Sequence, residues 1–550
     1  MKKGILKKLL VMGLTVTLGM TALVGCGDSN SESNGGSKQE ISYNLGAEVK
    51  TIDPALNNAV DGSIVIANAF EGLYKLDEDN KAIPGVAKSC DVSEDGLVYT
   101  FHLRDDAKWS DGKEVKAEDF AYAWKRALDP KTAADYAFQL YYIKGGEEFN
   151  TGKGTAEDLG VKVIDDSTLE VTLCKPTSYF LELTAFPTLM PLREDVIEGN
   201  NDTWTTDPAK YICNGPFKLE QYNMKDSYVF VKNDNYYDKD KVKADKLTFK
   251  MIVDEISAYS SLKNGELTGI DVVPVAEIEK GKEEGYVQIS PCISTYYYCL
   301  NVNNHTENLP EDVKKALSNK DVRHALNLAI DREKIVKEIT QGGQTPAHSF
   351  VPKEILLKNG SMSSDKEYWD GEKCDVEEAK KLLAKAGYPN GEGLPTFEVL
   401  YNTAERHKLI AEAIQQMWAQ IGVKVNLKNE EWAVFQDSRT NGNYQIARHG
   451  WTGDYLDPMT FLDLLMTGLG NNDSKFANAQ YDELVRKAQQ EVDVKKRSDY
   501  LVQAEDILMD EMPILPIFYD TEVKGFSPKL KDYRVSPLGQ VYFDRAYLEE

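Results

Sequence analysis

The residue types that most often bind metals or act as nucleophiles are scattered along this chain of 550 residues. Six histidines form no H-E-x-x-H motif or other close cluster: His102, His305, His324, His348, His407 and His449. Apart from Cys26, the cysteines contain no Cys-x-x-Cys pair: Cys90, Cys174, Cys213, Cys292, Cys299 and Cys374. The sequence therefore predicts no metal site and no cofactor, and it leaves the disulfide state of these six cysteines open.

Other catalytic patterns fail on spacing. The glycine-rich residues 145–153 misplace their glycines for a phosphate-binding loop, and Gly154 stands where Ser or Thr would bind magnesium. The chain contains no G-x-S-x-G nucleophile elbow. An acidic pair such as Glu430 and Glu431 suits glycoside hydrolysis, but 89 acidic residues make any one pair uninformative. These observations favour a binding protein over an enzyme.

Cys26 is the one cysteine in a distinctive context. Four lysines precede an uncharged stretch, residues 9–24, which is typical of a secretory signal. A bilayer crossing needs roughly 20 residues, so this stretch is too short to span a membrane. The run Leu23-Val24-Gly25-Cys26 resembles a bacterial lipobox, which predicts a signal peptide at 1–25, a diacylglyceryl group on Cys26 and a flexible tether at 26–40. A plain secretion signal with an incidental cysteine is the alternative.

Charge narrows the range of partners. Without the four leader lysines, 60 basic residues face 89 acidic ones, a formal charge of about 29 negatives. Nucleic acid is therefore not an expected partner. Anionic headgroups would also repel this surface, so attachment to the cell membrane, on its extracytoplasmic side, would depend on the acyl anchor.

The elements that must position any site alternate between two periodicities. Residues 98–103 have the period of a strand, whereas residues 117–128 place Phe120 and Trp124 on one face of a helix. Further strands are expected at 168–173, 228–232, 247–253, 296–302, 396–400 and 423–427, and further helices at 322–330, 376–386, 408–421, 481–489 and 496–509. The pattern predicts an α/β protein with two or three cores, joined without a long linker after residue 40.

Five blocks together carry a resemblance to a known family. They are residues 87–126, 213–217, 321–332, 450–458 and 512–519, which include the runs CNGPF, DVRHALNLAIDR, GWTGDYLDP and MPILPIFY. In this order they resemble the oligopeptide-binding class, family 5, of bacterial solute-binding proteins, the receptors of ABC importers. The resemblance covers essentially the whole chain beyond the tether.

The resemblance implies a fold of two α/β lobes that are hinged like a flytrap and close around an extended ligand, with an additional domain inserted into the first lobe. It places the crossings near 298–303 and 517–520. Lobe one would comprise 41–75, 205–300 and 518–550. The additional domain would be 76–204, and lobe two 301–517.

A receptor for varied peptides must recognise what all peptides share. A buried carboxylate suits the N-terminal ammonium, because an unpaired buried charge costs several kcal/mol. Arginine or protonated histidine suits the C-terminal carboxylate. Strand-like pairing binds the backbone, while trapped water lets one pocket accept many side chains.

The resemblance also assigns residues to these roles. Asp454, the acid of the W-x-x-D motif, would bind the ammonium. Arg448 and His407 match positions that bind a ligand carboxylate. Residues implied to line the peptide site are Val60, Tyr136, Tyr297, Trp432, Trp451 and Tyr519. As independent observations, single residues of these types are more often ordinary core or surface groups.

Two departures from the family pattern leave peptide length and side-chain preference open. Asp520 follows Phe518 and Tyr519 where enterobacterial members have a third tyrosine, so an acid replaces an aromatic contact. Thr340 stands where a carboxylate-binding lysine can occur.

The sequence therefore predicts a monomeric receptor without enzymatic activity that captures oligopeptides and delivers them to an ABC permease. Two alternatives stay open. One is a receptor of the same fold for another solute, such as a nickel chelate or a signalling peptide. The other is an extracellular hydrolase anchored by Cys26.

Overall fold

A mixed sheet of 11 strands forms the centre of the computed structural model, which describes residues 38–177, 179–302, 309–352 and 366–550. The strand order is β15-β14-β16-β12-β17-β11-β1-β10-β9-β8, and β13 pairs with β17. The strands are β1 Glu40–Asn44, β8 Phe217–Asn223, β9 Ser227–Lys232, β10 Lys246–Lys250, β11 Gly269–Ile270, β12 Val287–Leu300, β13 Thr345–Pro346, β14 Phe397–Asn402, β15 Val425–Glu430, β16 Ile446–Thr452 and β17 Ile514–Phe526.

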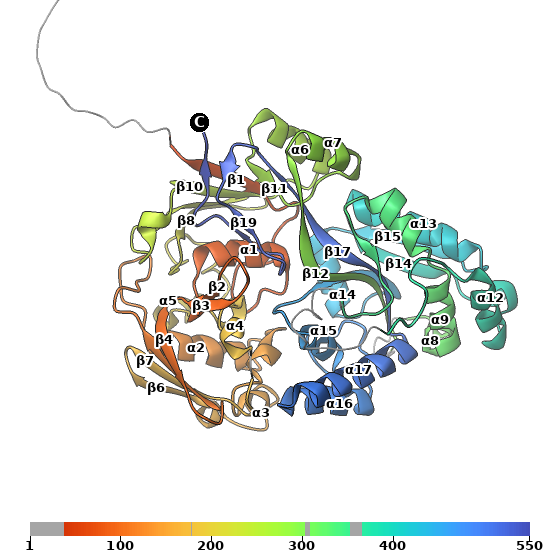
Figure 1. The fold of residues 1–550 in the computed structure, drawn as a ribbon, viewed down its shortest axis with the longest axis horizontal. Coiled ribbons are helices and arrows are strands. Elements are labelled where there is room, and N and C mark those ends of the chain that lie inside the picture. Colours follow the sequence, from red (N-terminus) through yellow and green to blue (C-terminus); the bar gives the residue numbers. More distant parts are fainter. Residues whose placement is uncertain (1–37, 178, 303–308, 353–365) are drawn as a thin grey trace, which may run out of the picture. The chain divides into compact units, whose positions relative to one another are not determined.

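Two long antiparallel strands, β12 and β17, join the two halves of this sheet. The second part of β12 pairs with β16, while the end of β17 pairs with β11. Figure 1 shows both strands passing from the elements around β1 and β11 to those around β14 and β15. Their register shifts between Pro291 and Thr295 and again between Tyr296 and Tyr297. The predicted two-lobed α/β fold is confirmed.

A separate sheet of four strands has the order β4-β5-β7-β6. Its strands are β4 Ala87–Val92, β5 Val98–Leu103, β6 Val161–Asp165 and β7 Thr168–Thr172. Helix α2, Ala117–Leu128, buries Phe120 and Trp124 completely. Asp119 in its first turn accepts a hydrogen bond from the backbone N–H of Lys116 at 2.8 Å, which satisfies a donor that the helix leaves free.

Short two-stranded sheets complete the β structure. They pair β2 Tyr74–Leu76 with β3 Ala82–Pro84, β18 Leu530–Lys531 with β21 Tyr547–Leu548, and β19 Arg534–Val535 with β20 Val541–Tyr542.

The helices cover the sheets and connect their strands. Besides α2, the α-helices of the described residues are α1 Val60–Ala69, α3 Gly146–Asn150, α4 Phe180–Leu183, α5 Glu194–Ile197, α6 Glu255–Asn264, α7 Ile278–Glu283, α8 Glu311–Ser318, α9 Lys320–Leu328, α10 Arg332–Lys334, α12 Val376–Lys385, α13 Glu405–Ala419, α14 Trp432–Thr440, α15 Met459–Leu462, α16 Ala479–Gln490 and α17 Val494–Glu511. Helix α2 and strand β5 have the predicted bounds, whereas α1, β16 and most of β17 were not predicted.

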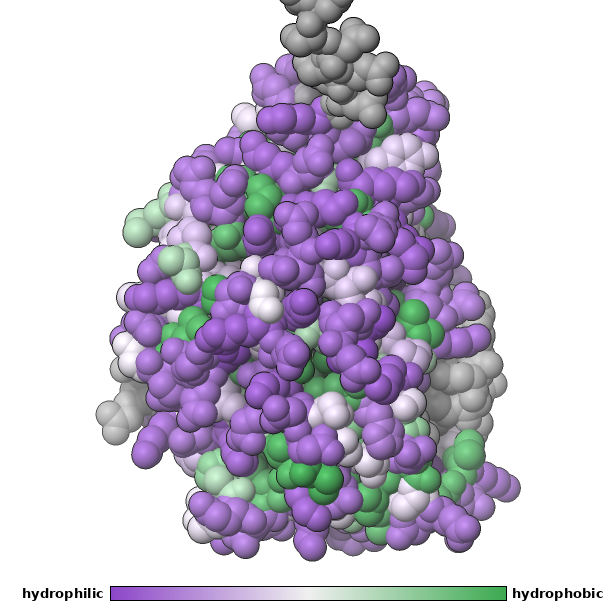
Figure 2. Space-filling model, turned by 90° about the vertical axis from the view of Figure 1, so that its left-hand side faces the viewer, coloured by the Kyte–Doolittle hydropathy of each residue, from purple (hydrophilic) through white to green (hydrophobic). Residues whose placement is uncertain are grey.

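The face of the molecule drawn in Figure 2 is mainly hydrophilic, and hydrophobic residues occur there in small groups. None of the helices in the described residues combines the length and apolar character that a membrane span requires. The six cysteines from Cys90 to Cys374 are free thiols.

Candidate functional site

A cavity of about 760 Å³ lies between elements from both halves of the large sheet. Its volume is within the range of roughly 300–1,000 Å³ that is usual for ligand pockets. Seven of the nine residues that the sequence analysis assigned to the ligand site line it: Val60, Tyr136, His407, Trp432, Arg448, Trp451 and Asp454.

Asp454 is a buried acid that forms no ion pair with a basic side chain in the part of the chain that the structure describes. It follows β16 by two residues, and its Oδ1 and Oδ2 accept hydrogen bonds from Tyr136 Oη at 3.3 Å and Gln139 Nε2 at 2.7 Å. Burial raises the pKa of this carboxyl group well above its usual range, and nearby Asp463 raises it further. Within the described chain, no Lys, Arg or His nitrogen lies within 4 Å of its oxygens. A cation entering the cavity would therefore favour its ionised form.

Aromatic rings hold the surroundings of Asp454 in place. Tyr136 stacks on Trp451 with ring centroids 6.1 Å apart, and it lies 5.0 Å from the ring of Phe186. The Trp451 indole N–H donates to the carbonyl of Thr460 at 2.7 Å. The Thr460 hydroxyl also accepts a hydrogen bond from the backbone N–H of Asp454 at 2.9 Å. Thr460 therefore fixes the positions of both Asp454 and Trp451.

Arg448 is a buried cation that forms no ion pair with any acid of the described residues. Its guanidinium lies 5.4 Å from the ring centre of Tyr296 and 5.9 Å from that of Trp432. Its Nε atom is buried and has no hydrogen-bond partner in the described residues. Burial lowers the pKa of Arg448, as expected for a charge with no carboxylate beside it.

His407 lies beside Arg448 as a neutral group. Its Nδ1 is 3.1 Å from Tyr296 Oη, and the residue is 8% exposed. Burial lowers the pKa of the imidazole well below its usual range, and the charges of Arg448 and Arg406 lower it further. His407 therefore offers a ligand one hydrogen bond and no charge.

Tyr297 and Tyr519 do not line the cavity. Tyr297 is 1% exposed and stacks on His449 with centroids 4.7 Å apart. The Tyr519 hydroxyl lies 2.6 Å from the Ser349 hydroxyl. Because successive strand residues point to opposite faces, Tyr296 reaches the cavity where Tyr297 had been expected.

Sequence reasoning missed several polar residues of the cavity wall. Asp61, in the first turn of α1, accepts a hydrogen bond from the Trp432 indole at 3.1 Å, and burial raises its pKa to about 6. Arg406 Nη2 lies 2.7 Å and 2.8 Å from the two oxygens of Asp520, the acid that departs from the family pattern. Position beside His407 was the only sequence signal for Arg406, and Asp61 had none.

Comparison with known proteins gives concordant matches. The family model described as bacterial extracellular solute-binding proteins, family 5 middle, matches residues 81–473. The oligopeptide-binding protein OppA of Bacillus subtilis is 38% identical over 550 residues, covering 96% of this chain and 97% of that protein. The structure of Haemophilus influenzae OppA in complex with RPPGFSPFR has a TM-score of 0.86 at 32% identity, covering 94% of this chain and 100% of that one.

Two structures of one relative differ in their similarity to this chain. A structure of the Escherichia coli murein tripeptide binding protein MppA has a TM-score of 0.86 at 34% identity, covering 94% of this chain and 99% of that one. The unliganded open form of MppA has a TM-score of 0.62 at 33% identity, covering 93% and 98%. The structure of this chain is therefore less similar to that open form.

Proposed function

This chain belongs to the bacterial extracellular solute-binding proteins of family 5, and we propose that it is a receptor that binds oligopeptides in the cavity beside Asp454 and delivers them to an ABC importer. One observation carries the proposal. The cavity wall holds a buried acid, Asp454, and a buried cation, Arg448, that no described residue neutralises. A linear peptide has the complementary pair of charges at its two ends.

The ammonium of the peptide would bind Asp454. Entry of a cation makes ionisation of the carboxyl group favourable, and the Tyr136 hydroxyl and Gln139 amide already donate to its oxygens. Charge-assisted hydrogen bonds of this kind are about twice as strong as neutral ones. Peptide side chains would lie beside Trp432, Trp451 and Val60, with water filling the remaining space.

The carboxylate of the peptide would bind Arg448. Its planar guanidinium is already oriented by the rings of Tyr296 and Trp432, so little rotamer entropy is lost on binding. Neutral His407 would add a hydrogen bond. Arg406 is engaged by Asp520 and is therefore less available to a ligand.

We propose the boundaries that the family resemblance implies, with lobe one at 41–75, 205–300 and 518–550, the additional domain at 76–204 and lobe two at 301–517. Contacts between the proposed lobes support a closed form. Lys50 Nζ lies 2.7 Å from Asp437 Oδ1, and Asp61 accepts from Trp432 across the same boundary. A ligand that touches both lobes only in the closed form would shift the equilibrium toward it.

Membrane attachment is part of the proposal. Cys26 lies outside the described residues, so its lipidation stays a prediction from the sequence. Removal of residues 1–25 and acylation of Cys26 would anchor the receptor to the cell membrane through the tether at 26–40, facing the extracytoplasmic side. The receptor would act as a monomer, without catalysis.

Isothermal titration calorimetry with tri- to hexapeptides and their N-acetylated forms tests this function. We expect the free-amino peptides to bind and the acetylated tripeptide to bind at least about tenfold more weakly, a difference of about 1.4 kcal/mol. Equal affinity for both forms would refute the assignment of Asp454. Mass spectrometry of the same peptides after incubation separates a receptor from a hydrolase, because a receptor returns them intact.

A further inference from the structure

A second cavity, of about 1,020 Å³, adjoins the ligand cavity. Four residues line both cavities and form a neck between them: Phe186, Asp454, Leu538 and Gln540. Asp454 therefore does not close the ligand site. The space continues beyond it, between β2, α4 and the strands near the C-terminus.

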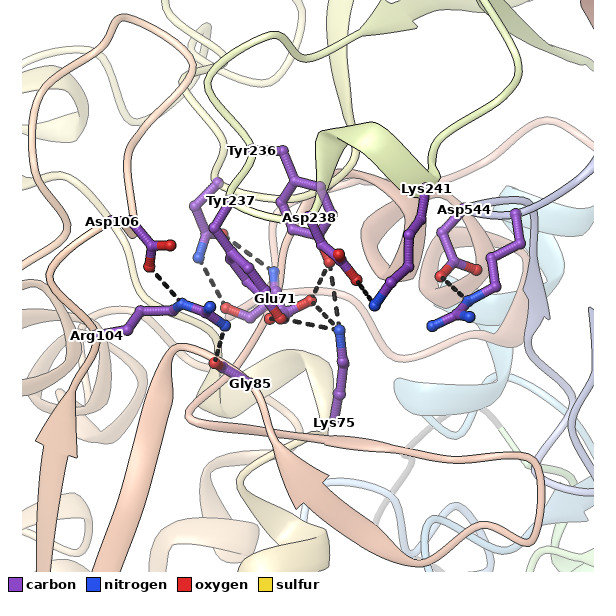
Figure 3. Close-up of polar contacts among 12 residues, drawn as sticks. Glu71, Lys75, Gly85, Arg104, Asp106, Tyr236, Tyr237, Asp238, Lys241 and Asp544 are labelled. Atoms are coloured by element: carbon purple, nitrogen blue, oxygen red, sulfur yellow. Dashed lines mark hydrogen bonds and ion pairs between the residues drawn. The ribbon is translucent and has the colours of Figure 1, made fainter.

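The second cavity has a strongly acidic wall. Asp or Glu occupies eight of its lining positions, and Lys or Arg occupies three. Some of these acids are satisfied within the protein. Figure 3 shows Glu71 beside Lys75, with which it forms an ion pair. The hydroxyl groups of Tyr236 and Tyr237 donate to its two carboxylate oxygens. Glu182, in contrast, is partly buried and has no ion pair within the described chain, and burial raises its pKa. The net charge of the wall favours a cationic occupant.

The neck contains a buried acceptor without a donor. Gln540 is 8% exposed, and its Oε1 has no hydrogen-bond partner among the described residues. Its backbone carbonyl accepts the N–H of Ser536 at 2.8 Å, which fixes the position of the residue. A buried acceptor without a donor destabilises the site, so a ligand N–H passing through the neck would be stabilised by donating to it.

Resting on the proposed function, we propose that the second cavity is an N-terminal extension of the peptide site, which receives the residues of a longer peptide that precede the residue beside Asp454. In this register the peptide backbone passes through the neck and an N–H donates to Gln540 Oε1. The ammonium then lies among the carboxylates of the second cavity, near Glu182. The receptor would thus accept two registers, with the amino end either at the neck or beyond it.

Size and chemistry support an extension of the chain rather than a pocket for one side chain. The volume is at the upper end of the roughly 300–1,000 Å³ of small-molecule pockets, and each extended residue advances the chain by only about 3.3–3.6 Å. Asp454 suits both registers, since its raised pKa lets it pair with an ammonium as a carboxylate or with a backbone carbonyl as a neutral acid.

A ladder of peptides tests the proposal in the full receptor. Calorimetry compares trialanine with peptides that carry one, two or three added N-terminal residues. We expect the wild type to bind each longer peptide within about threefold of trialanine, or about 0.65 kcal/mol. Ala185→Trp, which fills the second cavity only, should weaken the longer peptides about tenfold or more and leave trialanine unchanged. Val492→Trp is the control, because Val492 is exposed and lines neither cavity.

A second measurement needs no variant. A benzoylphenylalanine placed ahead of a tripeptide is photolysed in the wild-type complex, and the adduct is mapped by mass spectrometry. Adducts on Met190 or Ile83, which line the second cavity alone, would support the extension. Normal binding of trialanine with a loss of about tenfold per added residue, or adducts only outside the second cavity, would overturn it. If trialanine itself fails to bind, the proposed function falls, and this inference with it.

Discussion

Replacing Asp454 with asparagine is the most direct test of how the cavity recognises a peptide. The substitution keeps the shape of the side chain and removes its capacity for negative charge. Because Tyr136 and Gln139 are the only side-chain partners of the Asp454 carboxyl group in the described part of the chain, an ammonium bound beside the substituted amide would lack a counter-ion from those residues. The Tyr136 and Gln139 contacts can persist, so the loss reports the charge.

The magnitude follows from two opposing terms. Removing one partner of a buried charge pair costs about 3–5 kcal/mol. Part of this cost is offset, because burial raises the pKa of the free carboxyl group and so makes its ionisation on binding costly. We therefore expect a net loss of about 2–3 kcal/mol, a dissociation constant about 30- to 150-fold larger.

Calorimetry in two buffers of different ionisation enthalpy measures both terms. The wild type should release protons when a tripeptide binds, increasingly so as the pH is lowered, and Asp454→Asn should not. The affinity of the wild type should rise with pH as the free carboxyl group ionises, until the peptide amino group deprotonates near a pKa of about 8. Asp499→Asn, at an exposed site, is the matched control. An unchanged dissociation constant together with unchanged proton release would refute the reasoning.

Three further predictions concern charge and stability. Arg448→Met should weaken the binding of peptides with a free carboxylate by about tenfold or more and change the binding of C-terminally amidated peptides little. Calorimetry measures both peptide series, and an equal loss of affinity in the two would contradict this prediction. Arg126→Met should lower the free energy of unfolding by about 3–5 kcal/mol, because it leaves Asp53, 1% exposed and paired with Arg126 at 2.7 Å and 3.0 Å, without its cation; urea unfolding measures this. Asp463 has its pKa raised to about 8 in the folded protein, so it destabilises the fold increasingly as pH rises from the unfolded value of about 4 toward 8. Asp463→Asn should therefore raise the melting temperature at pH 8 more than at pH 4, and equal shifts at both values would contradict this.

Local patterns predicted elements where one periodicity dominates. Helix α2 and strand β5 have the predicted bounds because their apolar residues recur with a single clear period. Strand β12 was predicted only from Tyr296 onward, yet it begins at Val287. Its first part contains Ser290 and Pro291, and its strand character depends on pairing with β17, which no local pattern reveals.

Site residues could be predicted where a sequence motif identifies them. Residues that belong to the site only through a contact in the folded structure could not. Asp454 was identified through the W-x-x-D motif and lies on the cavity wall. Gln139, which donates to it, comes from a chain segment more than three hundred residues away and carries no motif. Tyr297 was predicted from the family resemblance, whereas Tyr296, whose side chain points to the opposite face of the strand, lines the cavity.

The register shifts between β12 and β17 mark the part of the molecule that should bend most easily. An intact antiparallel ladder resists torsion, whereas a bulge leaves a residue unpaired and increases local twist. Bending should concentrate between Pro291 and Tyr297, while the ladders on either side move as stiff arms. Cargo dwell time would then depend on the torsional stiffness of this short stretch as well as on contacts in the cavity. Substitutions of Pro291 or Thr295, which do not line the cavity, would retune release without touching the cargo.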